Sequence, residues 1–291
     1  MKPSVEMNTP DALVANVVHL ISLPNVYTQL ERTLKDPNHT RNDIAAIVNI
    51  DPALCARTLR IINSSYYALP KTIYNIGTAI NLIGEYDLRN IVLISSVVNS
   101  VDALTDNGIN ITEFWQHSIR CGMIAKLLAN TISAPDPELL FLTGLLHDIG
   151  QLIIYKNEPE LSTTITWHKT EENKQRYQIE QSLLGFGHPI VGALLLEKWS
   201  VPEQVSETVR YHHQPDEAPL YQKEAKIVGL ADQLIHFVES NSGLAEIDFE
   251  QLPPLISSYL DDLNISNLII FDLLTEAIDQ SQAIENIICT G

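Results

Sequence analysis

The sequence predicts an all-α protein, and three observations support that prediction. A capping residue followed by proline, a common start of a helix, occurs at Thr9-Pro10, Asp51-Pro52 and Asp136-Pro137. Between such starts, apolar residues recur at intervals of three and four, the period of an amphipathic helix. No Asn-Gly or Asp-Gly turn separates two alternating runs, so no β-hairpin is expected.

In the first third of the chain the same signals place each helix. Thr40 with Asp43 three residues later resembles a capping box, and Gly84 is expected to end a short helix. The helices expected here are 10–21, 41–48, 52–62, a short one ending at Gly84, and a longer, mostly buried one over 88–98.

Residues 102–112 are the most linker-like stretch, polar with one glycine, and we expect a subdomain boundary there. The expected division is residues 1–105 as an N-terminal helical subdomain and 106–291 as a second one with acidic C-terminal helices. The helices expected in the second part are 113–131, one opened by Asp136-Pro137, then 158–184, 189–199, 202–213, 221–239, and two more in the acidic tail.

Composition narrows the class of protein. Hydrophobic residues make up 45% of the 291 residues, enough for a packed core and too many for a disordered chain. The chain has 18 Lys and Arg against 36 Asp and Glu, a net charge of −18 that repels a phosphate backbone, so no nucleic-acid partner is expected. No basic residue follows Lys226, so the tail is either a set of solvated acidic helix faces or a docking surface for a basic partner.

We expect a cytoplasmic protein without a membrane partner. The first ten residues lack the apolar core of a secretory signal, and the most apolar long stretch, 91–101, is about half a bilayer span. Cys55, Cys121 and Cys289 are scattered and odd in number, which is typical of reduced core cysteines.

Candidate functional residues gather in the second half of the chain. Five histidines and two aspartates lie beside strongly apolar neighbours on predicted helices, as expected if packed helices converge on one buried site. Imidazole and carboxylate groups suit Fe, Mn, Zn or Ni, and Asp148 could bridge two closely spaced ions. Each histidine could instead be a core residue satisfied by hydrogen bonds. The seven candidates are His117, His147, Asp148, His188, His212, His213 and Asp232.

The same seven residues carry a family resemblance. Their order resembles the metal-binding pattern of HD-superfamily phosphohydrolases, particularly the HD-GYP cyclic-dinucleotide phosphodiesterases. Sequence blocks over about 20–215 are more similar to the HDOD domain, including IVNIDPALCARTLRIINSSYYALP, LTGLLHDIGQL and GHPIVGALLLEKW. This resemblance implies a two-part helical fold and a signalling module in which hydrolase activity is usually absent. The other histidines, His19, His39, His168 and His236, are interpreted as structural or surface residues.

Two departures from the active relatives bear on function. Where those relatives carry a lysine for the substrate phosphate, this sequence has Gln151, a possible substrate-side residue without charge. Their Gly-Tyr-Pro loop is replaced by Gln214-Pro215-Asp216-Glu217, whose carboxylates would repel a phosphate.

Two functions remain open from the sequence. The first is a bacterial-type signalling module that binds one or two divalent transition-metal ions, has weak or no hydrolase activity and acts through separate signalling proteins. The second is a metal-dependent phosphohydrolase of nucleotides or cyclic dinucleotides, in which the ions stabilise the attacking and leaving oxygens. His212 and His213 are adjacent on a predicted helix, about 100° apart, so at most one is expected to ligate a given ion.

Overall fold

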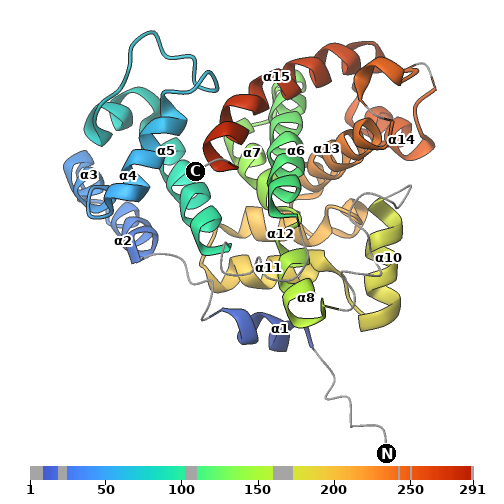
Figure 1. Ribbon diagram of the computed structural model, residues 1–291, viewed down its shortest axis with the longest axis horizontal. Helices are drawn as coiled ribbons and strands as arrows, with labels where there is room; N and C mark the ends of the chain where they lie inside the picture. The colour runs from blue at the N-terminus through green and yellow to red at the C-terminus, as the bar shows by residue number, and fades with distance from the viewer. Residues whose placement is uncertain are drawn as a thin grey trace, which may run out of the picture. The chain divides into compact units, whose positions relative to one another are not determined.

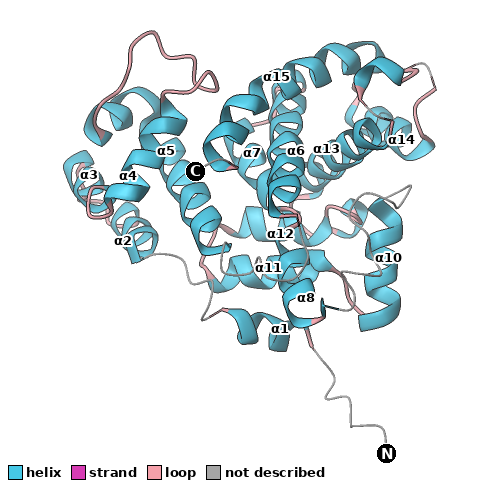
Figure 2. Ribbon diagram, in the orientation of Figure 1, coloured by secondary structure: helices cyan, strands magenta, loops and turns pink. Residues whose placement is uncertain are grey.

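The expected all-α class is confirmed. The computed structural model describes residues 9–18, 25–101, 110–159, 173–241, 243–249 and 251–289. Throughout these ranges the regular structure is helical, without a strand (Figure 2).

The chain forms two compact units, each built from two separate segments. One unit comprises residues 1–20 and 104–277, and the other comprises 21–103 and 278–291. This division differs from the contiguous segments 1–105 and 106–291 expected from the sequence. The first helix, α1 (Pro10–Val17), packs on α8 (Ile149–Asn157) and α11 (His188–Lys198). Its apolar residues Leu13, Val14 and Val17 are buried. Most of the expected boundary, 102–109, lies outside the described residues.

The smaller unit consists of helices whose starts are determined by local capping residues. Thr40 and Asp43 form the predicted capping box, and the Asp51 carboxylate accepts hydrogen bonds from the backbone N–H groups of Ala53 and Leu54. Gly84, at φ 85°, interrupts the long fourth helix as expected, in a conformation that favours glycine. The helices are α2 (Asn25–Leu34), α3 (Arg41–Val48), α4 (Pro52–Ile62), α5 (Ile76–Val101) and the end of α15 (Ile270–Ile288).

The larger unit holds the remaining described helices, of which α6 to α14 run from green to orange in Figure 1. Of the predicted helix over 158–184, residues 160–172 lie outside the described part. The elements are α1 (Pro10–Val17), α6 (Ile111–Thr131), α7 (Pro137–Leu146), α8 (Ile149–Asn157), α10 (Asn173–Leu184), α11 (His188–Lys198), α12 (Glu203–Tyr211), η2 (Pro215–Glu217), α13 (Gln222–Ser240), η3 (Leu244–Glu246), α14 (Pro254–Leu263), η4 (Asn267–Ile269) and the start of α15.

Glycines let the central helices of this unit approach closely. A Cβ at Gly122 of α6 would lie 2.6 Å from the carbonyl oxygen of Phe141 on α7, and one at Gly144 would lie 2.7 Å from the Cα of Gly122. A Cβ at Gly150 of α8 would lie 2.1 Å from the carbonyl oxygen of His188 on α11. These contacts bring the ends of α7, α8 and α11 together.

Within the described residues, the α7–α8 segment is long and strongly apolar. Pro137–Asn157 is long and apolar enough for a membrane span by composition, yet 94% of its most apolar stretch is buried within the protein. Arg176–Leu184 and His188–Lys198 pass the same test only as a pair bent by 81°. Burial of this extent is typical of a core helix in a folded protein.

The α6–α7 contact generates a stability prediction. Gly122→Ala places a methyl group against the backbone of Phe141, which cannot move aside as a side-chain tip can. We expect a loss of about 1–3 kcal/mol in the free energy of unfolding, measured by urea denaturation followed by circular dichroism. Gly77→Ala is the control, because its nearest neighbour would be a side-chain oxygen at 3.5 Å. Equal stability of the two variants would contradict the close packing.

Candidate metal centre

The larger unit brings all seven candidate residues together from six helices and their ends. His117 lies on α6 and Asp232 on α13, and the other five lie where helices begin or end. His147 caps the end of α7, Asp148 the start of α8, His188 begins α11, and His212 and His213 directly follow α12. His213 is half-buried, and the other six are at most 4% exposed.

Asp148 lies between two imidazole rings. Its Oδ1 is 3.0 Å from Nε2 of His188, and its Oδ2 is 3.4 Å from Nε2 of His147. Each carboxylate oxygen therefore faces a different histidine.

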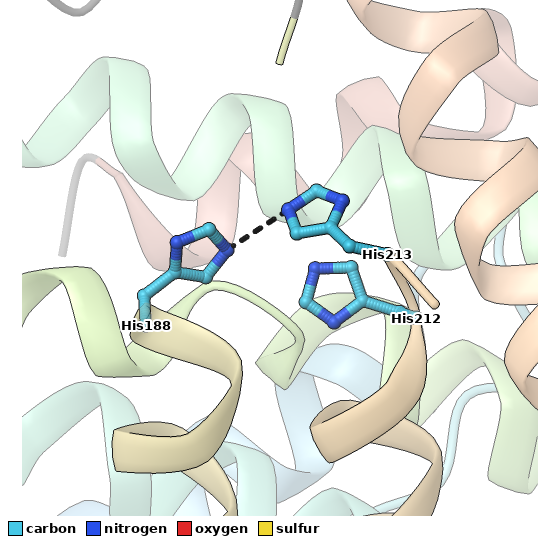
Figure 3. Close-up of side chains that lie close together, drawn as sticks. All are labelled: His188, His212 and His213. Carbon is cyan, nitrogen blue, oxygen red and sulfur yellow. Dashed lines mark hydrogen bonds between the residues drawn. The ribbon is translucent and has the colours of Figure 1, made fainter. Parts of the chain in front are cut away.

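Asp232 faces the same group from the other side. Its Oδ1 is 3.4 Å from Nε2 of His117 and 3.5 Å from Nε2 of His147, and its Oδ2 is 4.0 Å from Nδ1 of His213. The Nε2 atoms of His213 and His188 are 3.2 Å apart, the contact drawn in Figure 3. In that view the rings of His188, from the start of α11, and of His212 and His213 turn toward one another.

The described residues contain three overlapping sets of possible metal ligands. In each set the ligand atoms lie within 4.8 Å of one another. Two sets share His147 and two share His212, so the sets form one continuous cluster. The sets are His188 with His212 and His213, His117 with His147 and Asp148, and His147 with His212 and Asp232.

The first set bears on one expectation. His212 and His213 were expected to point about 100° apart along a helix, with only one of them ligating a given ion. His212 caps the end of α12 in an α-helical conformation, and the ring centroids of His212 and His213 lie 4.1 Å apart. Which of the two ligates an ion stays a prediction. Both residues belong to one set of possible ligands.

The histidines are oriented by hydrogen bonds on the side away from the cluster. Nδ1 of His147 donates to the carbonyl oxygen of Gly144 at 2.7 Å, and Nδ1 of His212 donates to that of Val209 at 2.7 Å. A carbonyl oxygen can only accept, so the proton resides on Nδ1 of each ring. Nε2 is then the nitrogen available to a metal. Metal-binding histidines ordinarily have such a hydrogen bond on the other ring nitrogen, which fixes the orientation of the ring.

Two carboxylates give the same support to the other rings. Oε2 of Glu180 accepts from both the backbone N–H and Nδ1 of His188, each at 2.7 Å. Oε2 of Glu239 lies 3.0 Å from Nδ1 of His117. Neither residue was identified from the sequence. A glutamate eight residues before a candidate histidine is a weak signal, and the pair 122 residues apart leaves no local pattern.

Two inward nitrogens lack a hydrogen bond. Among the described residues, Nε2 of His147 and Nε2 of His212 are fully buried without a hydrogen bond. A buried polar nitrogen left unsatisfied costs about 1–3 kcal/mol. A bound cation would satisfy both, so the donor set fits a metal.

In the cluster, histidines lie next to ionised carboxylates, which change the pKa values of the rings. Burial disfavours protonation of His117 and His188, but the negative charges around them outweigh it. Glu239 is the largest such influence on His117 and raises its pKa to about 10, while Glu180 raises the pKa of His188 to about 9. Without a metal, protons therefore balance the buried carboxylates.

The remaining groups complete this pattern. Burial opposes ionisation of Asp148, but the adjacent His147 ring holds the pKa of that carboxyl well below its usual range. Burial lowers the pKa of His212, and it lowers that of His213 to about 3. Burial also opposes protonation of His147, but the adjacent Asp148 raises its pKa well above the usual value. Without a metal, His212 and His213 are therefore neutral, while His117, His147 and His188 hold protons that a metal would displace.

Gln151 lies at the edge of the cluster, three residues after Asp148, and is 1% exposed. Its Oε1 accepts a hydrogen bond from Nη1 of Arg176 at 3.1 Å. Position 151 carries no charge of its own, and the guanidinium of Arg176 on α10 lies beside it. Tyr177, which follows Arg176, packs its ring against that of His213, with 5.0 Å between the ring centroids. Its hydroxyl donates a hydrogen bond to Oε1 of Gln214 at 2.7 Å.

Of the histidines interpreted as structural, two are described. His39, in the smaller unit, lies 2.9 Å from Oε2 of Glu85. His236 is on α13, four residues after Asp232, and outside the three ligand sets. His19 and His168 lie outside the described residues.

Solved structures of other proteins share this fold. A solved structure from Shewanella amazonensis SB2B, named as a proposed phosphohydrolase, matches with a TM-score of 0.75 at 24% identity over 95% of this chain and 97% of that chain. An HDOD domain protein of unknown function from Geobacter sulfurreducens matches with a TM-score of 0.72 at 23% identity, over 95% and 96% of the two chains. At these identities the likeness shows a shared fold.

Sequence comparison identifies the family. An uncharacterized protein from Treponema pallidum (strain Nichols) is 28% identical over 241 residues, which are 81% of this chain, and the chain spans 45% of that relative's length. The family model of the HDOD domain matches residues 20–215, the range over which the sequence resembles that domain. The chain therefore belongs to the HDOD domain family.

Proposed function

We propose that this protein is a regulatory HDOD module that binds a divalent transition metal through the seven clustered residues and hydrolyses cyclic dinucleotides weakly or not at all. One observation carries the proposal: outer hydrogen bonds on Nδ1 orient four imidazoles so that Nε2 faces the two shared carboxylates. Those four are His117, His147, His188 and His212.

The donor set selects the class of metal. Imidazole nitrogens with two carboxylates suit Fe, Mn, Zn or Ni, whereas Mg and Ca prefer oxygen ligands. The two oxygens of Asp148 face different histidines, which supports two ions bridged by this residue. When bound, the metal would supply a Lewis acid and would lower the pKa of a bound water.

Burial of the cluster argues against a bulky substrate. His147 and His212 are inaccessible to solvent, and Asp148 is 3% exposed. In a cyclic dinucleotide the phosphodiester lies inside a large ring system, so it would need an open site. Of the two carboxylates that replace the Gly-Tyr-Pro loop, Asp216 pairs with Lys226 at 3.0 Å, and Glu217 adds negative charge on the η2 segment beside Gln214.

The partners that we propose are separate signalling proteins in the cytoplasm. The net charge of −18 disfavours nucleic acid and an anionic membrane surface. A phosphohydrolase remains the second candidate function. It is favoured by the complete ligand set and by the guanidinium of Arg176 beside Gln151.

Metal content tests the cluster directly. We expect protein purified without added ions to contain Fe, Mn, Zn or Ni. We expect His147→Ala to lower metal affinity at least about 100-fold, because loss of a residue that only hydrogen-bonds to a ligand already lowers metal affinity about 10–100-fold. Elemental analysis and calorimetric titration measure both. His39→Ala in the smaller unit is the matched control and should retain the metal. Equal metal content in the two variants would refute the site.

The pKa shifts predict how metal affinity depends on pH. A metal must displace the protons held on His117 and His188, so its apparent affinity should rise with pH until about 9–10. In the metal-free protein these raised pKa values stabilise the fold fully below pH about 6.5, and that stability is lost as pH rises through 9–10. Titrations in two buffers of different ionisation enthalpy count the protons released. An affinity unchanged between pH 6 and 9 would contradict this.

An activity assay separates the two candidate functions. We expect protein loaded with Mn²⁺ or Fe²⁺ to convert cyclic di-GMP to the linear dinucleotide no faster than His147→Ala does, as followed by liquid chromatography. Turnover that depends on His147 would instead establish the phosphohydrolase.

A further inference from the structure

We propose that a groove in the smaller unit docks an acidic, amphipathic segment of a partner protein, whose apolar side chains enter the groove and whose carboxylates face Arg60 and Lys71. The groove lies in the unit that does not carry the metal centre. The inference rests on the proposed action through separate proteins, and it names the chemistry of the segment that binds.

The groove has a volume of about 560 Å³ and runs along the end of α4. Leu59 of α4, Ile73 of the following loop and Ile287 of α15 line it, so its surface is mainly apolar. More than half of its lining residues are exposed, and the groove is therefore open to solvent along one side. A small molecule would remain largely in water there, whereas ligand pockets ordinarily bury most of their ligand. An open apolar groove suits the apolar face of a protein segment.

Asn63 fixes the shape of the groove. This residue follows α4, and its Nδ2 donates to the carbonyl oxygens of Leu59 at 2.9 Å and Ile73 at 2.8 Å. Its Oδ1 accepts a hydrogen bond from the backbone N–H of Ile73 at 2.7 Å. One side chain thus fastens both backbone groups of Ile73 to the end of the helix. Because this wall is held in place before binding, docking of a partner requires little ordering of the groove.

Tyr74 lies at the rim of the groove. The residue is 82% exposed, next to Ile73, which is 5% exposed. A tyrosine offers a large apolar area and a hydroxyl at low entropic cost, and tyrosine is enriched in protein interfaces. A single exposed apolar residue is ordinary on a protein surface. Here the exposed ring borders an apolar groove, and the combination indicates an interface.

The groove region is positive although the chain is acidic. Residues 52–84 contain Arg57, Arg60 and Lys71 and no Asp or Glu, whereas the whole chain has a net charge of −18. Among the described residues that line the groove, Arg60 alone is charged, and Lys71 precedes the lining residue Thr72. Arg60 and Lys71 are exposed, and within the described part of the chain neither forms an ion pair.

Charge complementarity therefore selects an acidic segment. Charges more than about 8 Å away are largely screened at physiological ionic strength, so a docked segment responds mainly to the cations beside the groove. A nucleic acid would extend over the surrounding surface of a chain with a net charge of −18, which repels it. The occupant is thus a protein segment with apolar residues on one side and Asp or Glu on the other.

Three synthetic peptides of equal length test the docking by fluorescence anisotropy with the full chain. They share leucines at intervals of three and four, and their remaining positions carry glutamate, glutamine or lysine. We expect the glutamate peptide to bind most tightly and the lysine peptide most weakly. The net charge of −18 alone would give the reverse order, so this ranking reports on the groove. A glutamate peptide that binds no better than the glutamine peptide would overturn the proposal, as would binding by none of the three.

Matched substitutions assign the binding to the groove. Arg60→Glu should weaken binding of the glutamate peptide about tenfold, because it replaces an attraction by a repulsion of similar size. Arg32→Glu is the control, since Arg32 is an exposed arginine of α2 in the same unit and outside the lining. Ala56→Gln places a longer, uncharged side chain in the groove and should weaken binding of the glutamate peptide. Equal effects of Arg60→Glu and Arg32→Glu would show a general charge effect and would overturn docking in the groove.

A second copy of this chain is the alternative occupant, and sedimentation velocity distinguishes it. We expect Ala56→Gln to leave the oligomeric state unchanged. A dimer of the unmodified protein that dissociates in Ala56→Gln would overturn the partner segment as occupant. Circular dichroism verifies that each variant folds, and Tyr74→Ser, at an exposed position of the rim, replaces Ala56→Gln where that variant does not fold.

Elemental analysis of the same samples separates this proposal from the metal centre. Arg60→Glu should retain the metal content of the unmodified protein, so a failure of docking would leave the proposed metal binding intact. A chain that takes up no metal but still prefers the glutamate peptide would overturn the metal binding alone.

Discussion

The burial of two ionised carboxylates is the constraint on which the larger unit depends. Asp148 and Asp232 are 3% and 1% exposed, and a carboxylate removed from water is costly unless opposite charge or hydrogen-bond donors surround it. The surrounding groups are imidazole rings from α6, α7, α11 and α12. The helices that carry those rings must therefore end or cross at one place, and glycines in α6, α7 and α8 permit the close approach.

The fold could be predicted largely from local signals. Capping residues such as Thr40 and Asp51 determine where a helix starts, and Gly84 determines where one is interrupted, because each acts on neighbouring backbone groups. The assembly into units could not be read in this way. Helix α1 belongs to the larger unit through packing on α8 and α11, more than 130 residues away in sequence.

The candidate site, like the fold, could be predicted from the sequence only in part. The seven residues were identified by their order, through a family resemblance, and the structure brings them together. Glu239 and Arg176 were missed because their roles depend on helices that meet only in the folded chain. The helix that carries His212 and His213 was expected to run to residue 213, whereas α12 ends at Tyr211 and His212 caps it.

Glu180 joins two parts of the larger unit through a single oxygen atom. Its Oε2 holds both the first backbone N–H of α11 and the Nδ1 of His188, so the ring cannot turn without disturbing α10. If the proposed metal binds, its occupancy of the cluster is thermodynamically linked to the position of α10. A displacement of α10 that weakens metal binding by a given factor is then favoured by the same factor when the metal is absent. Under the proposed function, the buried centre would control the position of α10, and a signalling protein that contacts α10 would respond to it.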